Sequence, residues 1–268
     1  MPQVTANGTE LHYDDTASGS ETIVMAHGLL LNGRMFDGVI TELRNRYRCI
    51  TFDFRGQGQS AISPNRYDLD TLTEDAAGLI RELGCGPCHF LGFSMGGFVG
   101  MRLAVQHPEL VRSLILVGTS ASREPQRLKF RLLGRAARCL GVRAVTPLVM
   151  PVQFGRSFLR DPARAGLRQE WFDRIAANDL TGGLMGVNAV VARTDFSGQL
   201  GHIRVPTLVV VGAEDRPTPP AEAKKLLAGI AGAELVIVPR AGHAVPIEEP
   251  AVTAEAIAHF LTAHPARL

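Results

Sequence analysis

The sequence has little of several features that mark special classes of protein. It contains only four cysteines in 268 residues, too few to supply a disulfide framework for a chain of this size. No stretch approaches the roughly 18 uninterrupted apolar residues of a membrane span, and the opening Met1–Gln3 lacks the pattern of a signal peptide. The net charge of +2 does not by itself indicate nucleic-acid or membrane binding. We therefore expect a cytoplasmic protein with no nucleic-acid partner and no membrane partner.

What remains is an ordinary globular composition, 46% hydrophobic and 20% charged. Short apolar or β-branched runs alternate with longer helical patterns, which predicts an α/β protein with mostly parallel strands. Asn7-Gly8 lies between two short runs and predicts an antiparallel hairpin at the start of the sheet. Buried strands are predicted at Ile23–Ala26, Cys49–Phe52, His89–Leu91, Leu114–Val117, Thr207–Val211 and Leu235–Val238. Helices are predicted over Leu72–Leu83, Met95–Gln106, Ala221–Leu227 and Thr253–Thr262.

The strand pattern stops between Ser120 and Phe196, where Arg, Leu and Ala recur at helical spacing. Because strands resume afterwards, we predict a helical cap, residues 120–196, inserted into a core of residues 1–119 and 197–268. Residues 123–174 hold twelve Lys and Arg against four acids. This basic stretch is either a solvated helical face or a surface that attracts anionic substrates to a crevice beneath it.

The segment Gly92-Phe93-Ser94-Met95-Gly96 joins a predicted strand to a predicted helix. Small residues at positions 92 and 96 permit a sharp turn that exposes the Ser94 hydroxyl above the sheet, as a nucleophile requires. The alternative is a glycine-rich turn that carries a surface serine.

A serine hydroxyl is a poor nucleophile until a histidine, oriented by a carboxylate, accepts its proton. The strand Thr207–Val211 leads into Asp215, and the strand Leu235–Val238 leads into His243. Both loops lie at the same sheet edge as Ser94, where ligands of open parallel sheets bind. Glu214 is the competing acid, but the Gly212-x-x-Asp215 spacing favours Asp215.

Acyl transfer also needs two backbone donors for a developing oxyanion. The N–H of Met95 and the N–H of Leu29, in the loop after His27-Gly28, are the candidates, and His27 itself is interpreted as a brace for that loop. Candidate substrate-binding residues are Trp171, Phe154 and Val187, although core packing of the cap explains them equally well. No metal-ligand spacing is present, so we expect no metal and no cofactor.

Two other motifs invite a functional interpretation. Cys85-Gly86-Pro87-Cys88 has the letters of a redox pair, but it follows a predicted helix instead of opening one, so no helix dipole lowers the pKa of the first thiol. The glycines of Asp53–Ser60 lack the lysine and the following helix of a phosphate-binding loop.

Several of these motifs together resemble those of the α/β-hydrolase superfamily. They are His27-Gly28, Asp53-x-Arg55-Gly56-x-Gly58-x-Ser60, Gly92-x-Ser94-Met95-Gly96-Gly97, Gly212-x-x-Asp215 and Gly242-His243 with Glu248-Glu249-Pro250. The resemblance implies a mostly parallel eight-stranded sheet with helices on both faces and an inserted helical cap. Chain length and Pro217–Pro220 make the sequence similar to the small-esterase and 3-oxoadipate enol-lactonase branch, although His27-Gly28 departs from that lactonase.

We therefore predict a serine hydrolase that cleaves a small-molecule carboxylic ester or lactone through an acyl-enzyme on Ser94. The same residues also suit a carbon–carbon bond hydrolase or a cofactor-free perhydrolase. A third hypothesis, from another class, is a ligand receptor built on this fold. The sequence leaves the oligomeric state open.

Overall fold

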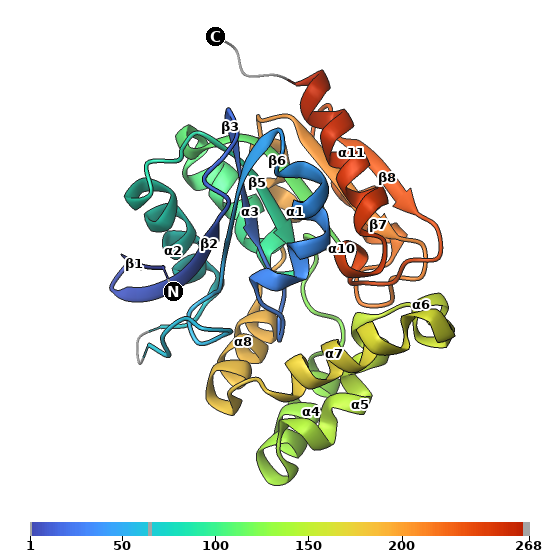
Figure 1. Cartoon of the computed structure of the whole chain (residues 1–268). Helices are drawn as coiled ribbons and strands as arrows, with labels where there is room; N and C mark the ends of the chain where they lie inside the picture. Colours follow the sequence, from blue (N-terminus) through green and yellow to red (C-terminus); the bar gives the residue numbers. More distant parts are fainter. Residues whose placement is uncertain (1, 64–65, 265–268) are drawn as a thin grey trace.

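The computed structural model describes residues 2–63 and 66–264 and contains one open eight-stranded sheet (Figure 1). The strand order is β1-β2-β4-β3-β5-β6-β7-β8. The pairs β1–β2 and β2–β4 are antiparallel, and the other pairs are parallel, which confirms the predicted sheet. The strands are β1 Gln3–Ala6, β2 Thr9–Asp15, β3 Glu21–Ala26, β4 Tyr47–Phe52, β5 Cys88–Phe93, β6 Val111–Val117, β7 Thr207–Gly212 and β8 Glu234–Val238.

The two ends of the sheet differ in how well the sequence predicted them. The hairpin between β1 and β2 is confirmed, and its turn has positive φ at both Asn7 and Gly8, as a tight two-residue turn requires. The predicted strand Leu235–Val238 is confirmed as β8, but the prediction that it is buried is wrong. β8 is the last strand of the sheet, so it has a strand neighbour on one side only, and its Ile237 is 40% exposed.

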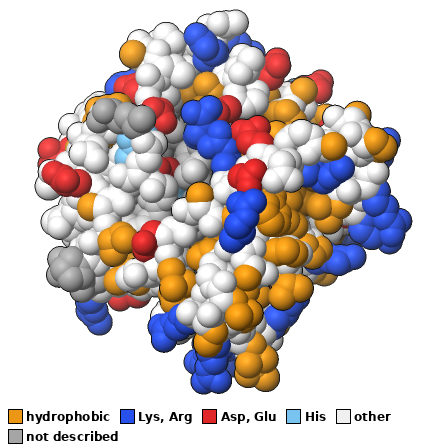
Figure 2. All heavy atoms as spheres, turned by 60° about the horizontal axis from the view of Figure 1, so that its bottom comes forward, with side chains coloured by type: hydrophobic (Ala, Val, Ile, Leu, Met, Phe, Trp, Pro, Cys, Tyr) orange, Lys and Arg blue, Asp and Glu red, His pale blue; other side chains and the backbone are white. Residues whose placement is uncertain are grey.

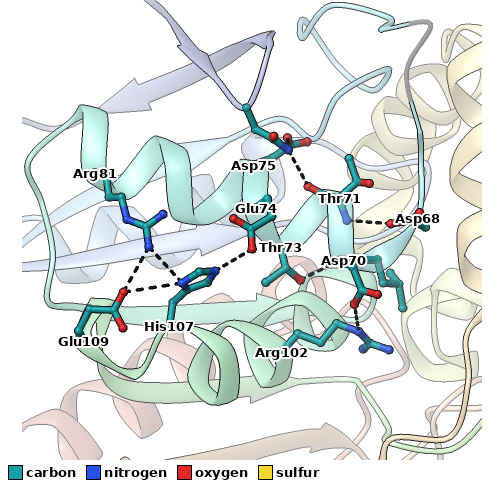
Figure 3. A network of polar contacts seen from close by, with 12 residues as sticks. Asp68, Asp70, Thr71, Thr73, Glu74, Asp75, Arg81, Arg102, His107 and Glu109 are labelled. Carbon is teal, nitrogen blue, oxygen red and sulfur yellow. Dashed lines mark hydrogen bonds and ion pairs between the residues drawn. The ribbon is translucent and has the colours of Figure 1, made fainter.

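Helices cover both faces of the sheet, as predicted, and a separate apolar cluster fills each side (Figure 1). One face carries α2 Leu69–Glu82, α3 Met95–Gln106 and α9 Pro220–Gly229, and the other carries α1 Asp37–Leu43, α10 Val245–Glu248 and α11 Pro250–Ala263. A polar network joins α2 to α3 and the turn after it (Figure 3). In this network Arg102 contacts Asp70, and Arg81 contacts Glu109.

Between β6 and β7 the chain forms only helices, which lie together beyond one end of the sheet (Figure 1). They are α4 Arg127–Leu140, α5 Val142–Gln153, α6 Arg156–Arg160, α7 Ala165–Ala176 and α8 Leu180–Ala192. We use "cap" for residues 120–196, which contain these helices. Short 3-10 turns occur at η1 Gly33–Phe36, η2 Pro108–Leu110, η3 Pro162–Arg164 and η4 Ser197–His202; η4 packs on α3 and α9 of the core.

None of the helices within residues 2–63 and 66–264 is long and apolar enough to cross a membrane.

Candidate active site

Ser94 lies in the turn that joins β5 to α3, with φ of 50° and ψ of −109°. This left-handed conformation is strained for a residue with a side chain, and it holds the hydroxyl clear of the backbone. The turn is tight enough that a Cβ on Gly96 would lie 2.2 Å from the carbonyl oxygen of Ala26. Thr119 Oγ1 donates to the Ser94 carbonyl at 2.8 Å and ties the turn to the segment after β6.

The structure brings Ser94, His243 and Asp215 together, although they are far apart in the sequence. His243 Nε2 lies 3.0 Å from Ser94 Oγ, and His243 Nδ1 lies 2.9 Å from Asp215 Oδ2. His243 and Asp215 are 5% and 4% exposed, so their hydrogen bond lies out of water. This is the geometry in which a carboxylate orients an imidazole and the imidazole accepts a serine proton.

Thr218 supports the Asp215 carboxylate, and the sequence analysis did not identify it as a site residue. Its backbone N–H donates to Asp215 Oδ1 at 2.8 Å, and its hydroxyl donates to Oδ2 at 2.9 Å. Glu214, the competing acid, instead accepts from the N–H and hydroxyl of Ser157 at the base of the cap. Asp215 therefore contacts His243, whereas Glu214 contacts the cap.

The loop after β3 supplies the first expected oxyanion donor. Leu29 N–H makes no hydrogen bond with the described residues, whereas the next amide, Leu30 N–H, donates to Gln57 Oε1 at 2.8 Å. Met95 is the first residue of α3, where an N–H has no intrahelical acceptor. Both predicted donors are thus available beside the serine turn.

His27 acts as a brace for this loop, as the sequence analysis favoured. Its Nδ1–H donates to Gly28 O at 2.7 Å, and its Nε2 accepts from Phe54 N–H at 3.0 Å. Complete burial lowers the pKa of His27, which keeps the ring neutral. The Asp53–Ser60 segment, rejected above as a phosphate loop, helps to hold the same loop because Asp53 Oδ1 accepts from Gly33 N–H at 2.8 Å.

Glu248 connects the cap to the histidine loop and was also missed as a site residue. Its Oε2 accepts from Gly242 N–H at 2.9 Å and from Gly155 N–H of the cap at 3.1 Å. Its Oε1 is buried without a hydrogen-bond partner among the described residues. Burial raises the pKa of Glu248 to about 7, and the two N–H donors only partly offset this effect.

A cavity of about 170 Å³ lies between the cap and the loops that flank the serine. Leu29, Leu30, Arg216 and Pro217 contribute to its lining from the core side, and Glu124, Gln126 and residues of α4, α5 and α8 line the rest. Its walls are mainly apolar side chains, among them Phe130, Leu133, Val145, Val149, Val187 and Leu184.

Of the three predicted substrate-binding residues, only Val187 lines this cavity. Trp171 and Phe154 are 4% and 3% exposed and pack in an apolar cluster, where Phe154 stacks on Phe158. This cluster joins cap helices to one face of the core, a tertiary packing that a sequence pattern does not reveal. Trp171 and Phe154 are therefore packing residues and do not line the cavity.

Two polar side chains at the cavity keep free positive charge. Lys129 and Arg216 line it, are exposed, and form no ion pair with any described residue. Glu124, also in the lining, is already paired with Arg193 at 2.6 Å. The cavity is therefore apolar with a positive entrance.

Burial raises the pKa of both Cys85 and Cys88, the opposite of what an active redox pair requires. Among residues 2–63 and 66–264, no three His, Cys, Asp or Glu side chains gather as a metal site would need.

A serine turn between strand and helix, with an acid and a histidine after neighbouring strands of a mostly parallel sheet, defines the α/β-hydrolase class of proteins. Residues 21–250 match the family model described as alpha/beta hydrolase fold, and the chain belongs to this family. It is accordingly a hydrolase.

The chain is similar along nearly its whole length to several known proteins. A Pseudomonas syringae protein with the provisional name carbamate hydrolase RutD is 27% identical over 257 residues, covering 91% of this chain and 95% of that protein. A pimeloyl-[acyl-carrier protein] methyl ester esterase from Aeromonas hydrophila is 29% identical, with coverage of 89% and 94%. Among solved structures, the enol-lactonase from Burkholderia xenovorans LB400 has a TM-score of 0.91 and 28% identity, with coverage of 97% and 100%.

Proposed function

We propose that the protein hydrolyses a small carboxylic ester or lactone through an acyl-enzyme on Ser94. The observation that carries the proposal is the unbroken contact from Asp215 through His243 to Ser94 Oγ, at 2.9 Å and 3.0 Å, beside the Leu29 and Met95 amides. The resemblance to a methyl ester esterase and an enol-lactonase supports the same bond type.

In the first half of the reaction, Ser94 Oγ attacks the carbonyl carbon while His243 Nε2 takes the hydroxyl proton. The carbonyl oxygen becomes an oxyanion, which accepts hydrogen bonds from Leu29 N–H and Met95 N–H. His243 then gives its proton to the leaving oxygen, and the carbon–oxygen bond of the substrate breaks. The acyl group remains on Ser94.

In the second half, His243 takes a proton from water as the water attacks the acyl carbon. Collapse of this second oxyanion releases the acid and returns the proton to Ser94. Throughout, the Asp215 carboxylate accepts from His243 Nδ1–H and stabilises the imidazolium that forms in each half. Asp215 keeps its ionisation state.

The cavity indicates which substrates fit. Its apolar walls favour an acyl or alcohol group without charge near the scissile bond, and Lys129 and Arg216 at its edge favour a distant anionic group. Carbamates offer the same attacked carbonyl carbon, and the RutD relatives give a reason to include them as a second candidate class.

The test is a turnover panel of aryl esters, lactones, carbamates and dienone acids with the wild-type protein and Ser94→Ala. We expect sustained turnover of an ester or lactone, lowered roughly 10⁴-fold or more in Ser94→Ala while the circular dichroism spectrum is unchanged. Turnover confined to the dienone acids would indicate the carbon–carbon bond hydrolase instead. Peracid formation from peroxide would indicate the perhydrolase, and a single turnover followed by a large change in cap stability would indicate the receptor.

A further inference from the structure

Helix α4 has an unusual charge pattern. Within Arg127–Leu140 it carries five cations and no acid, namely Arg127, Lys129, Arg131, Arg135 and Arg138. We propose that this helix docks the cap on an anionic lipid surface. The expectation of no membrane partner rested on low net charge and the lack of a span, and neither concerns a peripheral contact of this kind.

The side chains of α4 form two adjacent stripes. Arg127, Arg131, Arg135 and Arg138 follow one another at spacings of four, four and three residues, which places them along one side of the helix. Leu128, Leu132 and Leu140 occupy the neighbouring side and are 70%, 53% and 69% exposed. The opposite side, with Gly134 and Ala137, is buried against the rest of the cap. We call Arg131, Arg135, Arg138, Leu128, Leu132 and Leu140 the α4 outer face.

The cations of this face are not used within the protein. Among the described residues, Arg131, Arg135 and Arg138 form no hydrogen bond and no ion pair. Some other arginines of the cap are paired, for example Arg143 with Asp173 at 2.9 Å and Arg174 with Glu170 at 2.9 Å. The core network in Figure 3 is likewise internally paired. On α4, cations without a partner among the described residues therefore lie beside exposed leucines.

An anionic membrane is the occupant that matches both stripes. Leucines enter the boundary of the acyl chains, while arginines on the adjacent side reach phosphate groups, as in helices that lie in the interface. Figure 1 places α4 at the end of the molecule farthest from the sheet, and Figure 2 shows hydrophobic side chains gathered on the side that includes the cap, with Lys and Arg around them. Two copies of this face would repel each other because they carry only positive charge.

The cavity lies on the other side of α4, where the buried Gly134 and Ala137 also line it, so docking by the α4 outer face places the helix between the lipid and the cavity. Lys129, Phe130 and Leu133 of α4 line the cavity, together with Leu148 of α5, which is 62% exposed.

The experiment is vesicle co-sedimentation of the whole protein with phosphatidylcholine vesicles, with and without phosphatidylglycerol. One variant pair removes charge, Arg131→Glu with Arg135→Glu, and a second pair removes apolar contact, Leu128→Ser with Leu132→Ser. Matched controls change exposed residues of the core, Arg44→Glu with Lys224→Glu and Leu227→Ser with Val252→Ser. Hydrolysis of a short water-soluble ester reports on the fold and on the proposed catalysis separately.

We expect the wild type to bind only the anionic vesicles. The charge variant should bind about 30-fold more weakly or worse, from about 1 kcal/mol for each cation removed at the surface, and the leucine variant about 10-fold or worse. The core controls should bind like the wild type, and all variants should hydrolyse the soluble ester within about twofold of it. The proposal is overturned by equal binding to both vesicle types, by core controls that lose as much binding as the α4 variants, or by no binding at all. The absence of any vesicle binding is the result expected if the α4 outer face binds an acidic protein instead of a membrane.

Discussion

The Thr218 hydroxyl supports the Asp215 carboxylate and lies close to the His243 ring. Its hydroxyl contacts Asp215 Oδ2 at 2.9 Å and lies 3.2 Å from His243 Nδ1. The carboxylate therefore has two anchors on one residue, the hydroxyl and the backbone N–H, and only the hydroxyl can be removed by substitution.

Thr218→Val keeps the shape and the backbone donor and deletes the hydroxyl. We expect kcat to fall about 10- to 100-fold with little change in KM, because a hydrogen bond to a charged group is worth about 1.5–3 kcal/mol and Asp215 acts mainly in the transition state. Steady-state kinetics measure both constants, and Thr218→Ser should restore kcat. A rise in KM at unchanged kcat would show that Thr218 serves substrate binding and not the orientation of Asp215.

The burial of Glu248 makes the free energy of unfolding depend on pH, because it raises the pKa of this carboxyl group. Its pKa in the folded state, about 7, lies above the ordinary value of 4.5, so the folded protein holds this proton more tightly than the unfolded chain. The free energy of unfolding should therefore decrease as pH rises from about 4.5 to about 7 and not change further above that range on account of this group.

Glu248→Gln tests this dependence because the amide oxygen can accept from Gly242 and Gly155 without a charge. Relative to the wild type, the variant should gain stability between about pH 4.5 and about pH 7, by on the order of 3 kcal/mol at most from about 1.4 kcal/mol for each pKa unit. Urea unfolding at several pH values measures it, with the exposed Glu255→Gln as control. A constant difference across this range would mean that Glu248 is not buried in its charged form at neutral pH.

At the scale of the elements, the turn between β5 and α3 depends on a glycine that touches another strand. In Gly96→Ala the new Cβ would lie 2.2 Å from the Ala26 carbonyl, so α3 must shift and take Met95 N–H and Ser94 with it. We expect kcat/KM to fall about 100-fold, the effect of a displacement of about 1 Å at a reacting group.

Gly166→Ala is the matched control, since Gly166 also lies in a helix, α7, and nothing surrounds its Cβ position within 4 Å. It should leave kcat/KM unchanged and raise stability by roughly 0.5–1 kcal/mol. Equal activity of the two variants would show that the contact with Ala26 does not set the geometry of the turn.

Local pattern was enough to predict most elements. The predicted helix Met95–Gln106 has those bounds in the structure, because a tight glycine turn marks its start and an apolar pattern continues to His107-Pro108. Strands extend beyond the predicted runs where polar or aromatic residues continue them, as at Tyr47. The strand β8 was predicted, but its exposure was not, because five residues of local sequence do not reveal whether a strand lies inside the sheet or at its edge.

The proposed catalytic residues could be placed because each follows a strand, and parallel strands end at one edge. Thr218 and Glu248 could not, since their contacts with Asp215 and Gly155 exist only once loops and cap have packed. The same limit applies to Trp171 and Phe154, whose burial depends on how cap helices meet.

At the scale of the whole molecule, the uneven charge of the chain bears on which substrates reach the site. Residues 123–174 hold twelve Lys and Arg against four acids, and Lys129 of this stretch lines the cavity together with Arg216. A surface of one sign at such an entrance concentrates oppositely charged ligands.

We expect an ester that carries a distant carboxylate to have a higher kcat/KM than its neutral isostere. Its kcat/KM should fall as salt shortens the Debye length from about 10 Å at 0.1 M to about 3 Å at 1 M, whereas the neutral ester should show little change. Rates for the pair across this salt series measure the effect. Equal salt slopes for the two esters, or a preference for the neutral ester, would show that this positive charge does not attract substrates to the site.

The central claim is that Ser94 is the nucleophile and that His243 activates it. The most direct measurement is intact-protein and peptide mass spectrometry after reaction with an aryl phosphonate, which leaves a stable adduct on a reacting serine. The account predicts one adduct, on Ser94, formed at a much lower rate in His243→Ala and absent in Ser94→Ala. An adduct on another residue, or an unchanged rate in His243→Ala, would contradict it.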